Sequence, residues 1–230
     1  MKLQNRVLAI LLLSQSFFMF AAVGILSSSI QWPRSLGYEA KALMTIIAQN
    51  PDSVQLGYLC YLFSTLIFIP IIVLTQRLDS KNSKVFLSLA TIFGLFGTFF
   101  KILGISRWLT VQPLLAKQLI NAANNDHTIQ LFEIINQYFG TLGENFGVMF
   151  GIGLWTLFVG FYLLGNQSFN KLLTSAMIFM GLILFLGFFK ISGLNLPNVY
   201  LMITGAGWQL ITILLGLQIL KNSFETNKQH

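Results

Sequence analysis

Long apolar runs separated by short polar segments dominate this chain. Six of the runs are long enough to cross a bilayer as α-helices, which takes about 20 residues. The pattern predicts an all-α integral membrane protein, a six-transmembrane-helix bundle forming a single domain over residues 1–230. The predicted spans cover residues 7–30, 55–75, 85–108, 144–164, 172–194 and 199–220.

Two of the connections between these runs are long and carry shorter amphipathic segments. In the first connection, Ala40, Leu43, Met44 and Ile47 share one helical face. The second, residues 111–143, contains two such segments, and residues 124–126 between them offer an N-cap. The segments are too short and polar to span, so we predict amphipathic helices on the outer side. Two interpretations stay open: surface covers, or a lid over a cavity that opens outward.

Charge and composition sharpen this picture. Only 9% of the residues are charged, whereas soluble domains carry about 25%. The formal net charge is +7, but the basic residues lie between apolar runs and do not form one patch. That distribution is typical of membrane orientation and argues against nucleic-acid binding.

The basic residues predict that both termini are cytoplasmic, by the positive-inside rule. Residues 7–33 are uncharged over a stretch too long for the core of a cleaved signal peptide, so a retained first helix is favoured. We expect a multi-pass protein of the plasma (inner) membrane. The predicted cytoplasmic segments carry these basic residues: Lys2, Arg6, Arg77, Lys81, Lys84, Lys171, Lys221 and Lys228.

Several kinds of chemistry are excluded. Cys60 is the single cysteine, and His127 and His230 are the two histidines, so cysteine-based or multi-histidine metal sites and bis-histidine haem are not expected. The chain has no GxSxG, P-loop or Rossmann motif. We expect no metal and no cofactor, and the sequence leans away from an enzyme.

Four charged residues lie in or beside the predicted spans: Lys101, Arg107, Glu144 and Lys190. A charge inside a bilayer costs roughly 2.5–3.5 kcal/mol on insertion scales, so each needs a partner, a route to water or a function. At 1.5 Å per residue, all four fall in the outer half of the membrane. Glycine-rich faces of the third and fourth spans, with Gly97 on one and a Gly143 stripe on the other, are predicted to meet beside them.

Two interpretations of these charges remain. The lysines could extend their amines to the outer head groups, or one could form an ion pair with Glu144. Alternatively, Lys101, Arg107, Lys190 and Glu144 form an outward-facing pocket, where three cations against one carboxylate leave an excess that an anionic ligand neutralises. The second interpretation predicts that the protein binds or moves an anionic lipid or other amphiphile.

Two further functions are weighed. Glu144 and His127 are the weak candidates for catalytic residues if the protein is a membrane-embedded enzyme acting on an envelope lipid, with Glu144 as general base. Alternatively, the glycine-rich faces pack a partner in a membrane complex, and the protein is a structural subunit or an oligomer. A short similarity between residues 99–104 and 188–193 (FFKILG and FFKISG) hints at related helical hairpins.

An ordered pattern, RW…P.LA…Y.G..LGE, runs through the centre of the chain. It resembles a bacterial family of multi-pass membrane proteins catalogued only as a domain of unknown function, most clearly over residues 97–164. The resemblance implies no activity. Many members of that family are expected to carry a histidine after the glutamate, where this chain has Asn145. The positions that match the motif are Arg107, Trp108, Pro113, Tyr138, Gly143 and Glu144.

Overall fold

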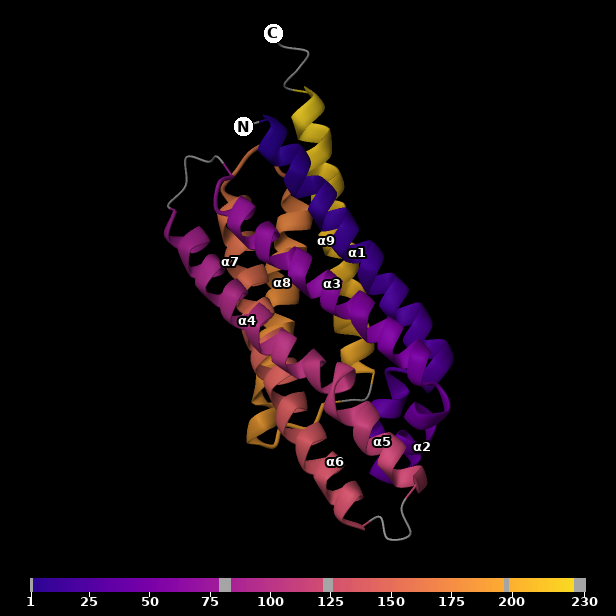
Figure 1. The fold of residues 1–230 in the computed structure, drawn as a ribbon. Helices are drawn as coiled ribbons and strands as arrows, with labels where there is room; N and C mark the ends of the chain where they lie inside the picture. The colour runs from indigo at the N-terminus through magenta and orange to yellow at the C-terminus, as the bar shows by residue number, and fades with distance from the viewer. Residues whose placement is uncertain (1, 79–83, 122–125, 197–198, 226–230) are drawn as a thin grey trace.

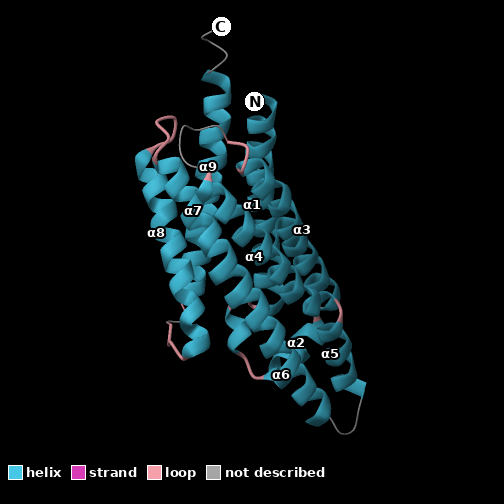
Figure 2. Cartoon of the chain, turned by 90° about the vertical axis from the view of Figure 1, so that its left-hand side faces the viewer, coloured by secondary structure: helices cyan, strands magenta, loops and turns pink. Residues whose placement is uncertain are grey.

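The computed structural model describes the whole chain except residues 1, 79–83, 122–125, 197–198 and 226–230. The described residues form helices joined by short connections, without a strand among them (Figure 2). In chain order the elements are α1 (Lys2–Ile30), η1 (Arg34–Gly37), α2 (Ala40–Gln49), α3 (Pro51–Thr75), α4 (Val85–Leu109), α5 (Val111–Asn121), α6 (Asp126–Gly140), η2 (Thr141–Ile152), α7 (Gly153–Leu164), α8 (Lys171–Gly187), η3 (Phe188–Ser192) and α9 (Tyr200–Glu225).

Six helical runs among the described residues are long and apolar enough to cross a membrane, so the predicted all-α multi-pass bundle is confirmed. The fourth span differs most from its predicted bounds. It belongs to one continuous helical run, Asp126–Leu164, made of α6, η2 and α7. An amphipathic segment and a span were predicted separately here, because the polarity of the sequence changes while the backbone stays helical.

Local sequence signals explain several of the helix ends. Pro51 begins α3 at a position where its missing N–H is not needed, and Asp52 follows in the first turn. Asn170 caps α8, its side chain accepting hydrogen bonds from the backbone N–H groups of Leu172 at 2.8 Å and Leu173 at 3.4 Å. After α8, the 3₁₀ segment η3 ends at Ser192 and is followed by Gly193, whose φ of 90° suits glycine.

The six spans form a closed ring. In order around it, α1 packs on α3, α3 on α4, α4 on η2 and α7, α7 on α8, α8 on α9, and α9 again on α1. Helix α1 begins and α9 ends at the same end of the molecule (Figure 1). One hydrophobic core, including Leu12, Ile72, Trp155 and Leu215, fills the ring toward that end.

Helices α2, α5 and α6 form a cap at the opposite end (Figure 1). The predicted face of α2 is confirmed, since Ala40, Leu43, Met44 and Ile47 are its buried residues. Together with Phe132 of α6, they belong to a second hydrophobic core that also takes in the ends of α1, α3 and α4. The cap therefore packs on the bundle through a core of its own. Of the predicted N-cap residues 124–126, residues 124 and 125 lie outside the described residues, and Asp126 begins α6.

Candidate functional site

Helix α4 and the segment η2 touch through their backbones. A Cβ added to Gly97 would lie 2.8 Å from the Cα of Gly151, and one added to Gly104 would lie 2.6 Å from the Cα of Gly143. Such distances leave no space for a side chain at either crossing. The predicted meeting of the two glycine-rich faces is confirmed, and it fixes the charged residues of α4 beside those of η2.

The segment η2 is a π-helix of 12 residues, Thr141–Ile152. In a π-helix the backbone bonds close from i to i+5, and π-helices are rare beyond a single turn and frequent at functional sites. Its glycines Gly143, Gly147 and Gly151 face α4. Its side chains Glu144, Val148 and Met149 instead line a cavity in the middle of the ring.

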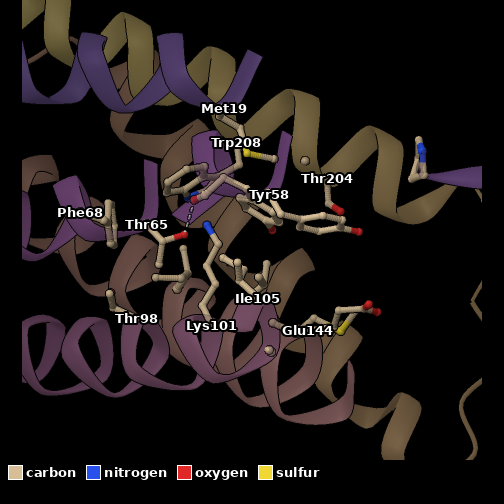
Figure 3. Close-up of a pocket in the computed structure, with 18 of the residues that line it drawn as sticks. Met19, Tyr58, Thr65, Phe68, Thr98, Lys101, Ile105, Glu144, Thr204 and Trp208 are labelled. Carbon is tan, nitrogen blue, oxygen red and sulfur yellow. Dashed lines mark hydrogen bonds between the residues drawn. The ribbon is translucent and has the colours of Figure 1, made fainter. Parts of the chain in front are cut away.

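This cavity lies between the two hydrophobic cores. Its volume is about 160 Å³, and a single water needs at least about 10–15 Å³ on the same measure, so a polar head group fits. Side chains reach it from α1, η1, α3, α4, η2, α8 and α9. Figure 3 shows Lys101, Tyr58, Thr204 and Trp208 converging on it. No described residue of α2, α5 or α6 lines it, so the cap contributes no wall.

Arg107 is held at the cap end of the cavity. It is only 6% exposed. Its Nη1 donates to the carbonyl oxygen of Gly104 at 3.1 Å, and the guanidinium carbon lies 5.4 Å from the ring centroid of Trp108. The Trp108 ring in turn stacks on Tyr58, with centroids 4.6 Å apart and planes inclined by 9°. The buried cation is therefore held at the cavity wall between the Trp108 ring and the carbonyl oxygen of Gly104.

Lys101 enters the cavity from a position about 1.7 turns before Arg107 on α4. Its Nζ lies 4.8 Å from the ring centroid of Tyr61, a cation–π contact. Glu144 is half-buried and extends away from Lys101 in Figure 3. Within the described part of the chain, no hydrogen bond or ion pair joins Glu144 to Lys101, Arg107 or Lys190, although the charges of Arg107 and Lys190 act on its carboxylate.

Three buried polar atoms around the cavity have no hydrogen-bond partner among the described residues: the Nε of Arg107, the hydroxyl of Tyr58 and the Oε1 of Gln209. Tyr58 is 2% exposed and Gln209 is 5% exposed. Leaving a buried polar group unpaired costs about 1–3 kcal/mol, and more for a charged group. A polar ligand bound in the cavity would supply hydrogen-bond partners for these two donors and one acceptor.

The structure brings together part of the predicted site. Lys101, Arg107, Glu144, Trp108 and Gly143 all line the cavity. Four other candidates do not line it. Lys190 is exposed on η3, His127 and Tyr138 are exposed on α6, and Pro113 is half-buried in α5.

The uncharged polar residues of the cavity were not predicted from the sequence. Tyr58 and Tyr61 reach it from α3, Gln15 from α1 and Gln209 from α9. The available signal was a glutamine inside an apolar run, which is costly in lipid unless paired. Gln15 is paired, because its Nε2 donates to the Ser64 hydroxyl at 2.8 Å, whereas the Oε1 of Gln209 has no partner among the described residues.

The described residues contain no group of three or more His, Cys, Asp or Glu side chains that could hold a metal ion.

In comparisons with known proteins, the family model described as "Domain of unknown function (DUF4386)" matches residues 6–216. No curated protein and no solved structure matches the chain.

Proposed function

The chain belongs to the DUF4386 family, and we propose that this multi-pass membrane protein binds or moves an anionic lipid or other anionic amphiphile in the central cavity. Lys101, Arg107 and Glu144 are the proposed ligand-binding residues. The anionic group would lie against the guanidinium of Arg107 and the hydroxyl of Tyr58, with the amine of Lys101 nearby.

One observation carries the proposal: the cavity has two cations against one carboxylate and three unpartnered buried polar atoms. A phosphate or carboxylate accepts hydrogen bonds from both donors and neutralises the excess positive charge. The Oε1 of Gln209 needs a donor, which a hydroxyl or amine on the same head group supplies. The chemistry favours a head group that combines an anion with a hydrogen-bond donor.

The proposed setting is the plasma membrane, with both termini in the cytoplasm and the cap outside. The basic residues near the ends of the spans support this orientation through the positive-inside rule. In that orientation the cavity lies in the outer half of the bilayer, beneath the cap. The ligand is therefore drawn from the outer leaflet or the space above it.

Native mass spectrometry of the protein extracted with its own lipids tests the proposal. We expect a defined anionic species on the wild type and its loss in Lys101→Met. The matched control is Lys117→Met, which makes the same substitution at an exposed position of α5. Lys190→Met asks whether charge outside the cavity contributes, and we expect a smaller effect than at Lys101. A bare wild type, or equal retention in Lys101→Met and Lys117→Met, would overturn the proposal.

A second candidate is an enzyme that acts on an envelope lipid with Glu144 as general base. It is favoured by the half-buried carboxylate of Glu144, which has no hydrogen bond or ion pair with a described residue and is set on a rare π-helix. Because His127 does not line the cavity, Lys101 would be its helper. Turnover of an added lipid that disappears in Glu144→Gln would support it, and retention without turnover across a broad lipid panel would exclude it.

A further inference from the structure

Helices α1 and α9 are closely packed at the end of the molecule away from the cap. The guanidinium carbon of Arg6 lies 4.7 Å from the ring centroid of Phe224. Farther along, a Cβ added to Gly216 would lie 3.2 Å from the Cβ of Leu12. No gap for a ligand remains between the two helices at this level.

The same contact opens toward the cap. Residues 7, 11 or 18 positions apart lie on nearly the same stripe of an α-helix. On α1, Ala9 and Ser16 are buried, whereas Phe20 on the same stripe is 52% exposed. On α9, Gly216 and Thr212 are buried, whereas Gly205 is exposed. Both facing stripes change from buried to exposed at about the same level, and the two ribbons diverge there in Figure 1.

The cavity reaches this opening. Met19 of α1 and Gly205 of α9 both line the cavity, and Gly205 is at the same time exposed on the surface. A Cβ added to Gly205 would meet no atom within 4 Å. Phe20 follows Met19 on α1, Met202 lies one turn before Gly205 on α9, and both are exposed apolar side chains. The rim of the opening therefore suits hydrocarbon, and the interior behind it carries the charges.

We propose that the gap between α1 and α9, rimmed by Phe20, Met202 and Gly205, is a lateral portal that holds an acyl chain of a membrane lipid. The head group occupies the cavity while the chain extends through the portal into the bilayer. This inference rests on the proposed function and narrows it: the ligand is a lipid that enters sideways, and not a water-soluble anion that enters from the outer face.

The test blocks the portal with a larger side chain and leaves Lys101 and Arg107 unchanged. In Gly205→Phe a bulky side chain fills the gap. In the control Ala206→Phe, the same side chain is added one position along α9, where the exposed residue does not line the cavity. Both variants and the wild type are reconstituted in phosphatidylcholine vesicles containing phosphatidylglycerol, extracted, and examined by native mass spectrometry. Glycerol phosphate, the water-soluble head group alone, is added separately in a thermal-shift assay.

We expect phosphatidylglycerol on the wild type and on Ala206→Phe, and about tenfold less on Gly205→Phe, a change equivalent to about 1.4 kcal/mol. Glycerol phosphate should raise the melting temperature of the wild type and of Ala206→Phe. Loss of that rise in Gly205→Phe would mean that the phenylalanine fills the cavity itself, and the smaller plug Gly205→Leu then replaces it. If Gly205→Phe does not fold, the smaller plug Gly205→Leu is compared with Ala206→Leu in the same way.

Three outcomes would overturn the portal, and they separate it from the proposed function. Equal retention in Gly205→Phe and Ala206→Phe removes the portal and leaves the head-group site intact. Stabilisation of the wild type by glycerol phosphate without retention of lipid identifies a water-soluble anion as the ligand. A wild type that responds to neither probe removes both proposals.

Discussion

Three of the seven buried side-chain polar atoms that have no partner among the described residues belong to residues that line the cavity. Most buried polar side chains near it are satisfied locally, as when the indole N–H of Trp208 donates to the Thr156 hydroxyl at 2.8 Å. The Tyr58 hydroxyl and the Arg107 Nε are not satisfied by any described residue. Because such groups destabilise a protein, the ones that face the cavity support a binding role, whereas others, such as the Nε1 of Trp155 and the Oε1 of Gln112, belong to residues that do not line it.

Tyr58→Phe separates the two contributions. Removing an unpaired buried hydroxyl should leave the free energy of unfolding unchanged or raise it by up to about 1 kcal/mol. The same change should weaken retention of the anionic ligand, since one donor is lost. Thermal unfolding in detergent and native mass spectrometry measure the two effects. A variant that loses stability and keeps its ligand would show that the hydroxyl has a structural role.

The glycine crossing gives a second prediction. In Gly151→Ala the new Cβ would overlap the Cα of Gly97, so α4 and η2 must separate, at a cost of about 1–3 kcal/mol or more. Gly24→Ala is the control, because a Cβ there meets no atom within 4 Å. Replacing an unconstrained helical glycine should stabilise by up to about 1 kcal/mol. Unfolding curves in one detergent compare both variants with the wild type.

The charged residues of the cavity could be predicted from the sequence, and its uncharged residues could not. Lys101, Arg107 and Glu144 are conspicuous because a charge in an apolar run is costly. A tyrosine such as Tyr58 is ordinary near a membrane interface. Its role depends on the stacking with Trp108, a contact between two helices that no spacing along one helix reveals.

Among the elements, the π-helix η2 was the least predictable. The glycine spacing at 143, 147 and 151 predicted a close helix contact and did not distinguish an α-helix from a π-helix, because a spacing of four residues is close to one turn of either. The similarity between residues 99–104 and 188–193 was likewise uninformative about backbone. The first copy lies in α4 and the second mostly in the 3₁₀ segment η3, so Lys101 lines the cavity and Lys190 is exposed.

The cap has a hydrophobic core of its own, so its stability can be tested separately from that of the rest of the bundle. Phe132 of α6 is fully buried in that core. Phe132→Ala should cost about 3–5 kcal/mol, and the loss should be local. Hydrogen exchange should rise in α2, α5 and α6 and stay unchanged in α7, α8 and α9. Faster exchange throughout the bundle would show that the two cores unfold as one.

At the scale of the whole molecule, hydropathy alone predicts the class of fold, a multi-pass helical bundle. Six apolar runs of sufficient length determine an even number of crossings, so α1 begins and α9 ends on one side. The ring and the cavity at its centre could not be predicted, because the exposed and inward faces of a lipid-facing helix are similarly apolar. Gly205 illustrates the difficulty: it is exposed and also lines the cavity, and it has no side chain whose polarity could indicate either face.

Orientation is the fourth prediction. In a Cys60→Ala background, single cysteines at Lys41 and His127 lie exposed on the cap, and cysteines at Lys84 and Lys171 lie exposed at the opposite end. A membrane-impermeant thiol reagent added to whole cells should label the first pair and spare the second until the membrane is permeabilised. Labelling of Lys84→Cys in intact cells would show that the orientation is opposite to the one proposed.

The placement of the four tryptophans has an optical consequence. Trp32, Trp108 and Trp208 line the cavity, and Trp155 packs edge-on, with centroids 4.7 Å apart, against Phe68, which also lines it. Nearly all of the tryptophan fluorescence of the native protein therefore originates within or next to the cavity. Its intensity and colour report occupancy without any label, and a brominated acyl chain lying between α1 and α9 would quench it from inside.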